Sequence, residues 1–591
     1  MEYDNGNEEI YKRVRTQKKP KHRILKWFIK IFVVIAIIAG IALAIKVAPN
    51  YKNNDITDRT NLVINYSNVT GRMKHNLIID DNGVVYLSLN DIANYYDGNI
   101  YFDEQYNQIV TSSETELAVL KLDENSMTVN GVEHEIKGAA KAQDGIYYLP
   151  ISEMEDVYNI KLTRSDNKII LESLDRKLTT AKANRKLSVK SKATILSRTL
   201  EKVNKDDKLV IAETEPNSLP AGWVKVRTQN GNIGYVMSEW LSSETVEREN
   251  RTFKKQIEGK VSLAWEYFSE YAKAPDNTGV KYDGVNVVSP SFFYLKLSDT
   301  EKDKLSMTDV VLQSRINENV GDEGVKYINW AHDNGYKVWA KVSNDTLSNT
   351  IDEFSYIINN YKLREIMIKD IIDYAEKYKL DGINIDFEYM YQNDSKAFSR
   401  FLIELAPQLR KRGVCLSVDV TAPNGDANWS LCYDRNLIGE VADYVVFMGY
   451  DQYGTSKIGT TSGFNWVENS IKSFMNYDEV PAEKIILGLP FYTKLWQTKN
   501  DETIRSAVVT MNNIAGSIPA NSSKEWKEDL QQYYVQYEQN GYVYKMWVED
   551  EESFSKKLEL VKKYNLAGAG YWRKGFEKAS IWKVIKSNLG L

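Results

Sequence analysis

The sequence predicts a multidomain protein: a C-terminal (β/α)₈ (TIM) barrel with a small α+β insertion, preceded by two small β-rich domains and an N-terminal transmembrane helix. Three observations support this fold class. An apolar segment lies near the N-terminus, short alternating strand patterns fill residues 60–243, and eight apolar runs separated by helical stretches follow residue 256. The length of 591 residues also exceeds what one hydrophobic core organises, so several domains are expected.

Composition excludes several classes of function. Lys and Arg number 76 against 81 Asp and Glu, a net charge of −5, which argues against nucleic-acid binding. Two cysteines, Cys415 and Cys432, cannot build a disulfide framework or a cysteine zinc site, and whether they pair is left open. The four histidines share no metal-ligand spacing. We therefore expect no metal, no cofactor and no nucleic-acid partner.

The N-terminal segment predicts a membrane anchor. Residues 31–45 are all apolar or glycine, and the flanking residues extend the segment to 28–48, the length of a spanning helix. Nine of the first 30 residues are Lys or Arg, a bias that keeps residues 1–27 in the cytoplasm and exports the chain beyond the apolar segment. The alternative is a cleaved signal peptide, because Ala42-Leu43-Ala44 resembles a cleavage triplet, although it lies inside the apolar run.

Residues 60–175 contain an internal repeat. Gly83–Ile92 matches Gly145–Met154, and a strand-like segment follows each copy, at Tyr101–Ser113 and Lys161–Ser173. Period-2 apolar patterning with Asx and Gly turns predicts small strands and a short helix in each half. The segment resembles the N-terminal domain of copper amine oxidases, which occurs on exported bacterial proteins. It lacks copper ligands, so the resemblance implies a spacer or a module that contacts the cell wall.

Residues 183–243 again read as short strands. The pattern Gly-Trp-x-Lys-Val, a turn and Gly-x-x-Gly-Tyr-Val, which contains Trp223 and Tyr235, resembles bacterial SH3-like domains. That resemblance implies binding to cell-wall peptides, while simple core packing of Trp223 and Tyr235 explains the same pattern. The charged segment 242–255 that comes next predicts a linker or a helical lead into the next domain.

Residues 256–591 alternate between strand and helix patterns. The helix before the fourth strand shows buried-face spacing at Ile368, Ile371, Ile372, Ala375 and Tyr378. Eight such strands suit a (β/α)₈ barrel, and the long interval between the last two predicts an inserted subdomain. The predicted strands are Val261–Ala264, Val285–Ser289, Lys337–Val342, Gly382–Phe387, Val414–Val420, Tyr444–Met448, Ile485–Leu489 and Ala567–Tyr571.

The fourth strand carries the chemistry. Side chains alternate between its faces, so Asn384, Asp386 and Glu388 share one face. Both faces of a parallel barrel strand are buried, so this polar face lines the barrel interior while the apolar face meets the outer helices. Two neighbouring carboxylates there repel unless one keeps its proton, the arrangement of a general acid beside a carboxylate. A calcium loop shares the acidic spacing, but the intervening Ile and Phe argue against it.

Three motifs in barrel order resemble glycoside hydrolase family 18, the chitinase family, which includes bacterial spore-cortex and cell-wall N-acetylglucosaminidases. The first is Asp-Gly-x-x-x-Asp-x-Glu, from Asp381 to Glu388, on the fourth strand. Met448-Gly449-Tyr450-Asp451 at the sixth strand matches the Met-x-Tyr-Asp of the family. Gly570-Tyr571-Trp572-Arg573 stands at the eighth strand, where the family places a tryptophan under the reacting sugar.

The resemblance implies a retaining mechanism in which the substrate's own 2-acetamido group is the nucleophile. Glu388 would protonate the glycosidic oxygen, Asp386 would hold the acetamido N–H, and Tyr450 would bind its carbonyl oxygen. The resemblance further implies four substrate-binding residues: Asn384, Met448, Asp451 and Trp572. Without their register to the strand-four motif, core packing would explain Tyr450 and Trp572.

One departure from the family concerns Asn384, because many chitinases have an acidic residue there. An amide at this position is still able to hydrogen-bond Asp386, but it cannot take a charge or a proton.

These observations predict a glycosidase that is anchored in the bacterial cell membrane and cleaves β-1,4-linked N-acetylglucosamine polymers outside it. Peptidoglycan is favoured over chitin and N-glycans by location alone. The alternatives are a sugar-binding cell-wall tether with little or no turnover and a true chitinase. The sequence leaves endo or exo action and the oligomeric state open.

Overall fold

The computed structural model describes residues 58–250, 256–269, 277, 279–295, 315–344, 351–454, 457–500 and 502–591. The predicted cytoplasmic tail and transmembrane helix lie outside these residues. Within the described ranges, no helix is long and apolar enough to cross a membrane. The chain divides into two compact units: one contains the chain up to Leu77 and Asn159–Arg251, the other contains Ile78–Tyr158 and Thr252–Leu591.

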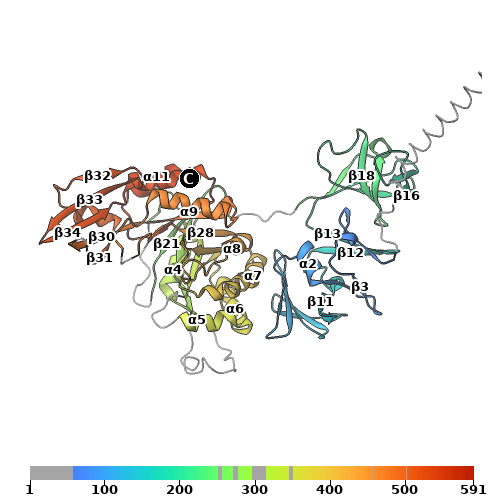
Figure 1. Cartoon of the computed structure of the whole chain (residues 1–591), viewed down its shortest axis with the longest axis horizontal. Helices are drawn as coiled ribbons and strands as arrows, with labels where there is room; N and C mark the ends of the chain where they lie inside the picture. The colour runs from blue at the N-terminus through green and yellow to red at the C-terminus, as the bar shows by residue number, and fades with distance from the viewer. Residues whose placement is uncertain are drawn as a thin grey trace, which may run out of the picture. The chain divides into compact units, whose positions relative to one another are not determined.

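Eight parallel strands close into a barrel in the second unit, which confirms the predicted barrel (Figure 1). Each strand pairs in parallel with the next, and the last pairs with the first. Their bounds agree with the predicted ones to within two residues. The strands are β21 (Val261–Glu266), β22 (Val287–Pro290), β25 (Lys337–Ser343), β26 (Gly382–Asp386), β27 (Cys415–Val420), β28 (Tyr444–Met448), β29 (Ile485–Pro490) and β35 (Gly568–Trp572).

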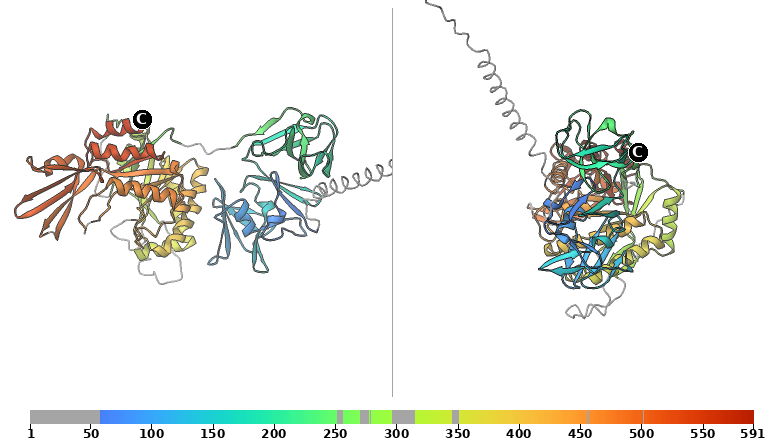
Figure 2. Two further views of the ribbon diagram at one scale, coloured as in Figure 1. Left: turned by 45° about the horizontal axis from the view of Figure 1, so that its top comes forward. Right: turned by 90° about the vertical axis from the view of Figure 1, so that its right-hand side faces the viewer.

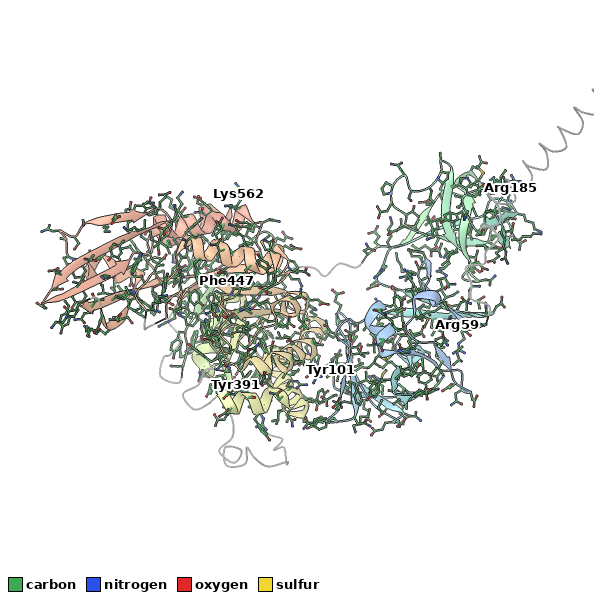
Figure 3. The ribbon with its side chains drawn as sticks, viewed as in Figure 1. Arg59, Tyr101, Arg185, Tyr391, Phe447 and Lys562 are labelled. Carbon is green, nitrogen blue, oxygen red and sulfur yellow. The ribbon has the colours of Figure 1, made fainter. Side chains whose placement is uncertain are left out.

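Helices cover the outside of the barrel (Figure 2). In α6, which precedes β26, the predicted stripe of isoleucines and Ala375 is buried, and Tyr378 follows the last helical turn. Side chains fill the space between strands and helices, as around Phe447 of β28 (Figure 3). The helices are α4 (Gly321–Asp333), α5 (Ile351–Asn359), α6 (Tyr361–Lys377), α7 (Ser395–Lys411), α8 (Arg435–Val441), α9 (Phe464–Asn476), α11 (Glu551–Lys563) and α12 (Ile581–Leu589).

Two additions interrupt the strand–helix alternation. An antiparallel pair, β23 (Phe293–Leu295) and β24 (Ile316–Glu318), follows β22. The interval between β29 and β35 holds a five-stranded antiparallel sheet and the short helix α10 (Ile514–Ser517). The strands of this insertion are β30 (Tyr492–Lys499), β31 (Glu502–Thr510), β32 (Lys524–Lys527), β33 (Gln532–Gln539) and β34 (Tyr542–Trp547).

The predicted repeat has matching elements in its two halves. The first half contains strand β4, helix α2 and a hairpin; the second contains strand β11, the 3₁₀ helix η3 and a hairpin. Strands β4 and β11 pair antiparallel with each other. The elements of the first half are β4 (Val85–Ser88), α2 (Leu89–Tyr95), β5 (Tyr101–Asp103) and β6 (Gln108–Ser112), and those of the second half are β11 (Ile146–Leu149), η3 (Ile151–Glu153), β12 (Ile160–Ser165) and β13 (Lys168–Ser173).

Seven further strands complete this β-rich region. Strands β7, β8 and β9 extend the β5–β6 hairpin into one antiparallel sheet, whereas β1 pairs in parallel with β13. They are β1 (Asn61–Ile64), β2 (Ser67–Asn68), β3 (Ile78–Ile79), β7 (Leu117–Lys121), β8 (Ser126–Val129), β9 (Val132–Glu135) and β10 (Lys141–Gln143).

A seven-stranded sheet occupies the region for which the SH3-like resemblance was stated. Its apolar core includes Val189, Val226 and Val236, whereas Trp223 and Tyr235 are half-buried and lie outside that cluster. Both aromatic side chains therefore retain surface, and the SH3-like assignment stays a prediction. The strands are β14 (Leu178–Lys182), β15 (Leu187–Lys190), β16 (Thr199–Val203), β17 (Lys208–Ile211), β18 (Trp223–Arg227), β19 (Ile233–Met237) and β20 (Thr245–Arg248).

Apolar side chains fill the barrel interior away from its functional end. Trp265 and Trp339 are at most 1% exposed, and a methyl group on Gly382 would lie 2.5 Å from the Trp339 ring. The glycine after Asp381 is therefore needed because the indole occupies the space of a side chain. Cys415 and Cys432 are both buried free thiols.

We predict that Gly382→Ala lowers the free energy of unfolding by roughly 1–3 kcal/mol, because the added methyl overpacks the core against a rigid ring. Thermal unfolding measures this as a reduced Tm. Gly516→Ala is the matched control, because no heavy atom lies within 4 Å of the new methyl. An equal Tm for the two variants would contradict the packing argument.

Candidate active site

Strand β26 presents its two faces as the alternation predicts. Ile383, Ile385 and Phe387 are fully buried in the cluster formed with the outer helices. The ring centroid of Phe387 lies 5.6 Å from that of Phe401 on α7. Asn384 bonds instead to side chains of other barrel strands, so the opposite face lines the interior. Asp386 and Glu388 follow it towards the carboxyl ends of the strands.

A cavity of about 140 Å³ lies at these carboxyl ends. Six of the seven predicted site residues line it, and the seventh, Asn384, lies beneath it with no exposed surface. Three lining residues were not predicted: Asp419 at the end of β27, Trp429 in the loop after that strand, and Tyr492 at the start of β30. The predicted residues that line the cavity are Asp386, Glu388, Met448, Tyr450, Asp451 and Trp572.

The backbone of Glu388 is held from two sides. Asn344, just after β25, accepts the Glu388 N–H at 2.9 Å and donates its amide to the Glu388 carbonyl at 2.8 Å. The Tyr433 hydroxyl donates to the Phe387 carbonyl at 2.8 Å. Tyr389 then takes a left-handed conformation, with φ of 52°, that turns the chain away from the strand. The half-buried Glu388 side chain therefore projects from a fixed backbone.

Asp386 is bound on one oxygen only. Its Oδ2 accepts a hydrogen bond from the Lys341 ammonium at 2.6 Å, and both side chains are 9% exposed. Its Oδ1 is buried and has no hydrogen-bond partner among the described residues. A buried carboxylate oxygen without a partner is costly, so Oδ1 is suited to receive a donor from a ligand.

Asn384 does not use its amide on Asp386. Its amide donates to Asp419 at 2.7 Å and to Ser417 at 3.1 Å. Its carbonyl oxygen accepts from the Trp265 indole at 2.9 Å and from Ser289 at 3.3 Å. Both amide protons are therefore used on β27, and Lys341 supplies the partner of Asp386 instead.

The sequence of residues 264–576, more than half of the chain, matches the family Glycosyl hydrolases family 18. The chain belongs to this family. Its members act on polysaccharides that contain N-acetylglucosamine, and the protein is therefore a glycosidase. Residues 63–172 match the copper amine oxidase N-terminal domain, which confirms the predicted resemblance there.

Curated relatives share the catalytic region. The uncharacterized glycosylase YvbX of Bacillus subtilis (strain 168) is 28% identical over 290 residues, 47% of this chain and 83% of YvbX. The cortical fragment-lytic enzyme of the same organism is 25% identical over 242 residues, 40% of this chain. The match spans only 56%, about half, of that enzyme's length.

Solved structures are similar to the chain at lower sequence identity. A chitinase from Chromobacterium violaceum ATCC 12472 superposes with a TM-score of 0.48 at 22% identity, over 56% of this chain and 99% of that one. The Bacillus cereus spore cortex-lytic enzyme SleL gives a TM-score of 0.46 at 20% identity, over 59% of this chain and 77% of SleL.

Burial and neighbouring charges shift the pKa values of two groups in this family 18 site. Burial raises the pKa of Asp419 well above its ordinary value, and the Asp386 carboxylate raises it further. Burial alone would lower the pKa of Lys341, but the charge and hydrogen bond of Asp386, together with the charges of Glu388 and Asp419, outweigh burial and the pKa is raised. Lys341 is therefore a cation, and Asp419 keeps its proton to higher pH than an ordinary aspartate.

Tyrosines and a second ion pair shape the cavity mouth. Burial raises the pKa of Tyr450 well above its ordinary value, so its hydroxyl remains a donor. Tyr492, whose ring centroid lies 6.4 Å from that of Tyr450, bonds Asp451 through its hydroxyl. Asp451 also pairs with Lys494 at 2.7 Å. The carboxylate of Asp451 is thus engaged at the rim.

Two aromatic surfaces border the cavity. Trp572 is half-buried, with its ring centroid 5.9 Å from that of Trp265. The ring of Tyr389 packs against Trp429, and their ring centroids are 4.7 Å apart. Indole faces of this kind suit the apolar face of a sugar ring. Metal chemistry has no comparable support: no group of three or more His, Cys, Asp or Glu within the described ranges could hold an ion.

Some of the site residues that the sequence analysis did not predict could have been found from the strand pattern, and others could not. Lys341 and Asp419 are charged residues inside otherwise apolar strands, and their alternation pattern could have placed them in the interior. Trp429 and Tyr492 lie in a loop and at the start of an insertion, where no periodicity reveals which way a side chain points.

We predict that Asn344→Ala lowers kcat about tenfold and changes KM less than threefold, because Glu388 loses two backbone hydrogen bonds without losing a contact to substrate. Steady-state kinetics on a soluble N-acetylglucosamine oligomer measure both constants. Asn588→Ala, which removes a comparable amide on α12, is the control. Equal kcat values for the two variants would contradict a positioning role for Asn344.

Proposed function

We propose that this protein is a membrane-anchored hydrolase that cleaves β-1,4-linked N-acetylglucosamine polymers outside the cell membrane, with peptidoglycan as its substrate. The reaction retains the anomeric configuration and uses the substrate's 2-acetamido group as the nucleophile.

The observation that carries this proposal is the state of the four carboxyl groups in the cavity. Asp386 is tied to Lys341 but keeps one oxygen open. Asp419 is buried, bonded to Asn384 and has a raised pKa. Asp451 is paired with Lys494. Glu388 is then the acid at the mouth, and none of the others is presented as a nucleophile for a two-carboxylate mechanism.

The first chemical step breaks the glycosidic bond. Glu388 gives its proton to the glycosidic oxygen while the acetamido carbonyl oxygen attacks the anomeric carbon, so that the leaving sugar departs and an oxazolinium ion forms. Asp386 Oδ1 accepts the acetamido N–H, and its charge stabilises the cation. The Tyr450 hydroxyl donates to the attacking oxygen and orients it.

The second step returns the enzyme to its starting state. Glu388, now a carboxylate, removes a proton from water, which attacks the anomeric carbon and reopens the ring. Two inversions at one carbon give net retention. Trp572 supplies the apolar surface on which the reacting sugar stacks.

The substrate assignment rests on location and relatives. A catalytic unit exported behind residues 28–48 meets peptidoglycan as the nearest N-acetylglucosamine polymer. The similarity to cortical fragment-lytic enzymes supports the same class of substrate. The copper amine oxidase N-terminal domain then acts as the spacer, and the SH3-like region contacts cell-wall peptides.

The anchoring proposal is tested by fractionation. We expect the full chain in the membrane fraction of a bacterial host. When intact cells are treated with a protease that can pass through their outer layers, the protease should remove the catalytic unit. A protein recovered wholly in the culture medium with a new N-terminus would support signal-peptide cleavage instead.

Two other functions remain candidates: a sugar-binding tether with little or no turnover, and a chitinase. We predict that Glu388→Gln lowers the release of soluble fragments from purified peptidoglycan at least a thousandfold, because the amide cannot donate a proton. Mass spectrometry of the digest measures fragment release. A variant as fast as the wild type would exclude the hydrolase mechanism.

The wild-type digest separates the remaining alternatives. Fragments ending in reducing N-acetylglucosamine, released faster than products from chitin oligomers, support the peptidoglycan assignment. Faster release from chitin oligomers would favour the chitinase. Proton NMR of the first products should show the β-anomer, and an α-anomer would exclude the substrate-assisted route.

A further inference from the structure

Lys341 is a buried cation that the family motif does not contain. It lies on β25, where its Cα is in register with Asn384 of β26, and its side chain enters the barrel interior with 7% of the residue exposed. No part of the proposed reaction requires a lysine. Burying a charged side chain in this position costs free energy unless the charge is paired and hydrogen-bonded.

The ammonium of Lys341 reaches two parts of the site at once. It donates to Asp386 Oδ2 at 2.6 Å and lies 5.4 Å from the ring centroid of Trp572. The charged and titratable groups that face it are Asp386 and Glu388 at the end of β26, and Asp419 on β27. It is therefore a single cation facing three carboxyl groups.

The Lys341–Asp386 pair differs from a structural ion pair elsewhere in the same unit. Lys557 and Glu549 are both fully buried, and both oxygens of Glu549 are used: one bonds Lys557 and Gln532, the other bonds Ser553. Asp386 has one oxygen bonded and one without a partner among the described residues. A pair left half-satisfied beside a cavity is arranged for a ligand.

We propose that Lys341 is a positioning residue that fixes Asp386 through Oδ2, so that Oδ1 remains aimed at the acetamido N–H of the substrate. Lys341 thereby takes the place of the acidic partner that many family members have at the position of Asn384. The charge of Asp386 is then set by a permanent cation and not by a shared proton. This inference rests on the proposed function, because it assumes that Asp386 binds an N-acetyl group.

The inference has a specific kinetic consequence. Removing the ammonium makes protonation of the facing carboxyl groups easier, and it removes one of the influences that lower the pKa of Asp419. The acid limb of the kcat/KM profile should move to higher pH, while the stacking surface for the sugar remains.

We predict that Lys341→Met lowers kcat at least tenfold, changes KM less than threefold and moves the acid limb upward by about one pH unit. Lys341→Arg keeps a cation and should keep the limb within a few tenths of a unit of its wild-type position. Full-length protein and a soluble N-acetylglucosamine oligomer serve for all variants. Lys369→Met, which removes an exposed lysine of α6 outside the cavity, is the control and should keep the wild-type profile.

A double-variant comparison tests whether Lys341 acts through Asp386. In an Asp386→Asn background, adding Lys341→Met should change kcat/KM less than twofold, because the group that Lys341 positions is already neutral. This comparison also covers the case in which Lys341→Met alone does not fold, since the double variant leaves no unpaired charge. A further tenfold loss in that background would overturn the inference.

The outcomes separate this inference from the function on which it rests. An unshifted acid limb and an unchanged kcat in Lys341→Met, with Glu388→Gln inactive, would overturn the role of Lys341 and leave the hydrolase intact. A Glu388→Gln variant with wild-type turnover would overturn the hydrolase itself.

Discussion

A closed parallel barrel buries both faces of its strands, and every polar group that enters its interior must find a partner there. This constraint governs the site. Asn384 meets it fully, with hydrogen bonds to three other strands of the barrel. Asp386 meets it with one oxygen, through Lys341, and its other oxygen is buried without a partner among the described residues. The unpaired Oδ1 of Asp386, a residue that lines the cavity, therefore marks where a substrate amide completes the hydrogen bonding.

The same constraint orders the charges. Three carboxyl groups face one ammonium, and they cannot all be ionised at low cost in a buried space. Burial favours the protonated form of Asp419, whereas the ammonium is bonded directly to Asp386. Glu388 stands further out, half-buried, on a backbone clamped by Asn344. The three carboxyl groups thus differ in burial and in their contact with the Lys341 ammonium, and they can take different roles although their chemistry is similar.

Sequence patterns determined the barrel well because its signals are local and periodic. The eight strands and the stripe of α6 follow from alternation and helical spacing, which hydrophobic burial enforces. The side of β26 that faces inward could also be predicted, and with it the meeting of Asp386, Glu388, Tyr450 and Trp572 in one cavity.

The partners of the interior groups could not be predicted, because they depend on which side chains meet across the barrel. Strand alternation placed Asn384 and Asp386 on one face but did not identify the partner of either side chain. The actual partners of both residues lie on other strands, and Lys341 comes from 45 residues earlier in the chain. Trp429 and Tyr492 reach the cavity from irregular segments whose direction no pattern specifies.

The most direct test of the account is a crystal structure of Glu388→Gln with an N-acetylglucosamine oligomer bound. We predict that the acetamido N–H lies within hydrogen-bond distance of Asp386 Oδ1, that its carbonyl oxygen lies at the Tyr450 hydroxyl, and that Lys341 still bonds Oδ2. An acetamido group that points away from Asp386, or a sugar bound outside the cavity, would contradict it.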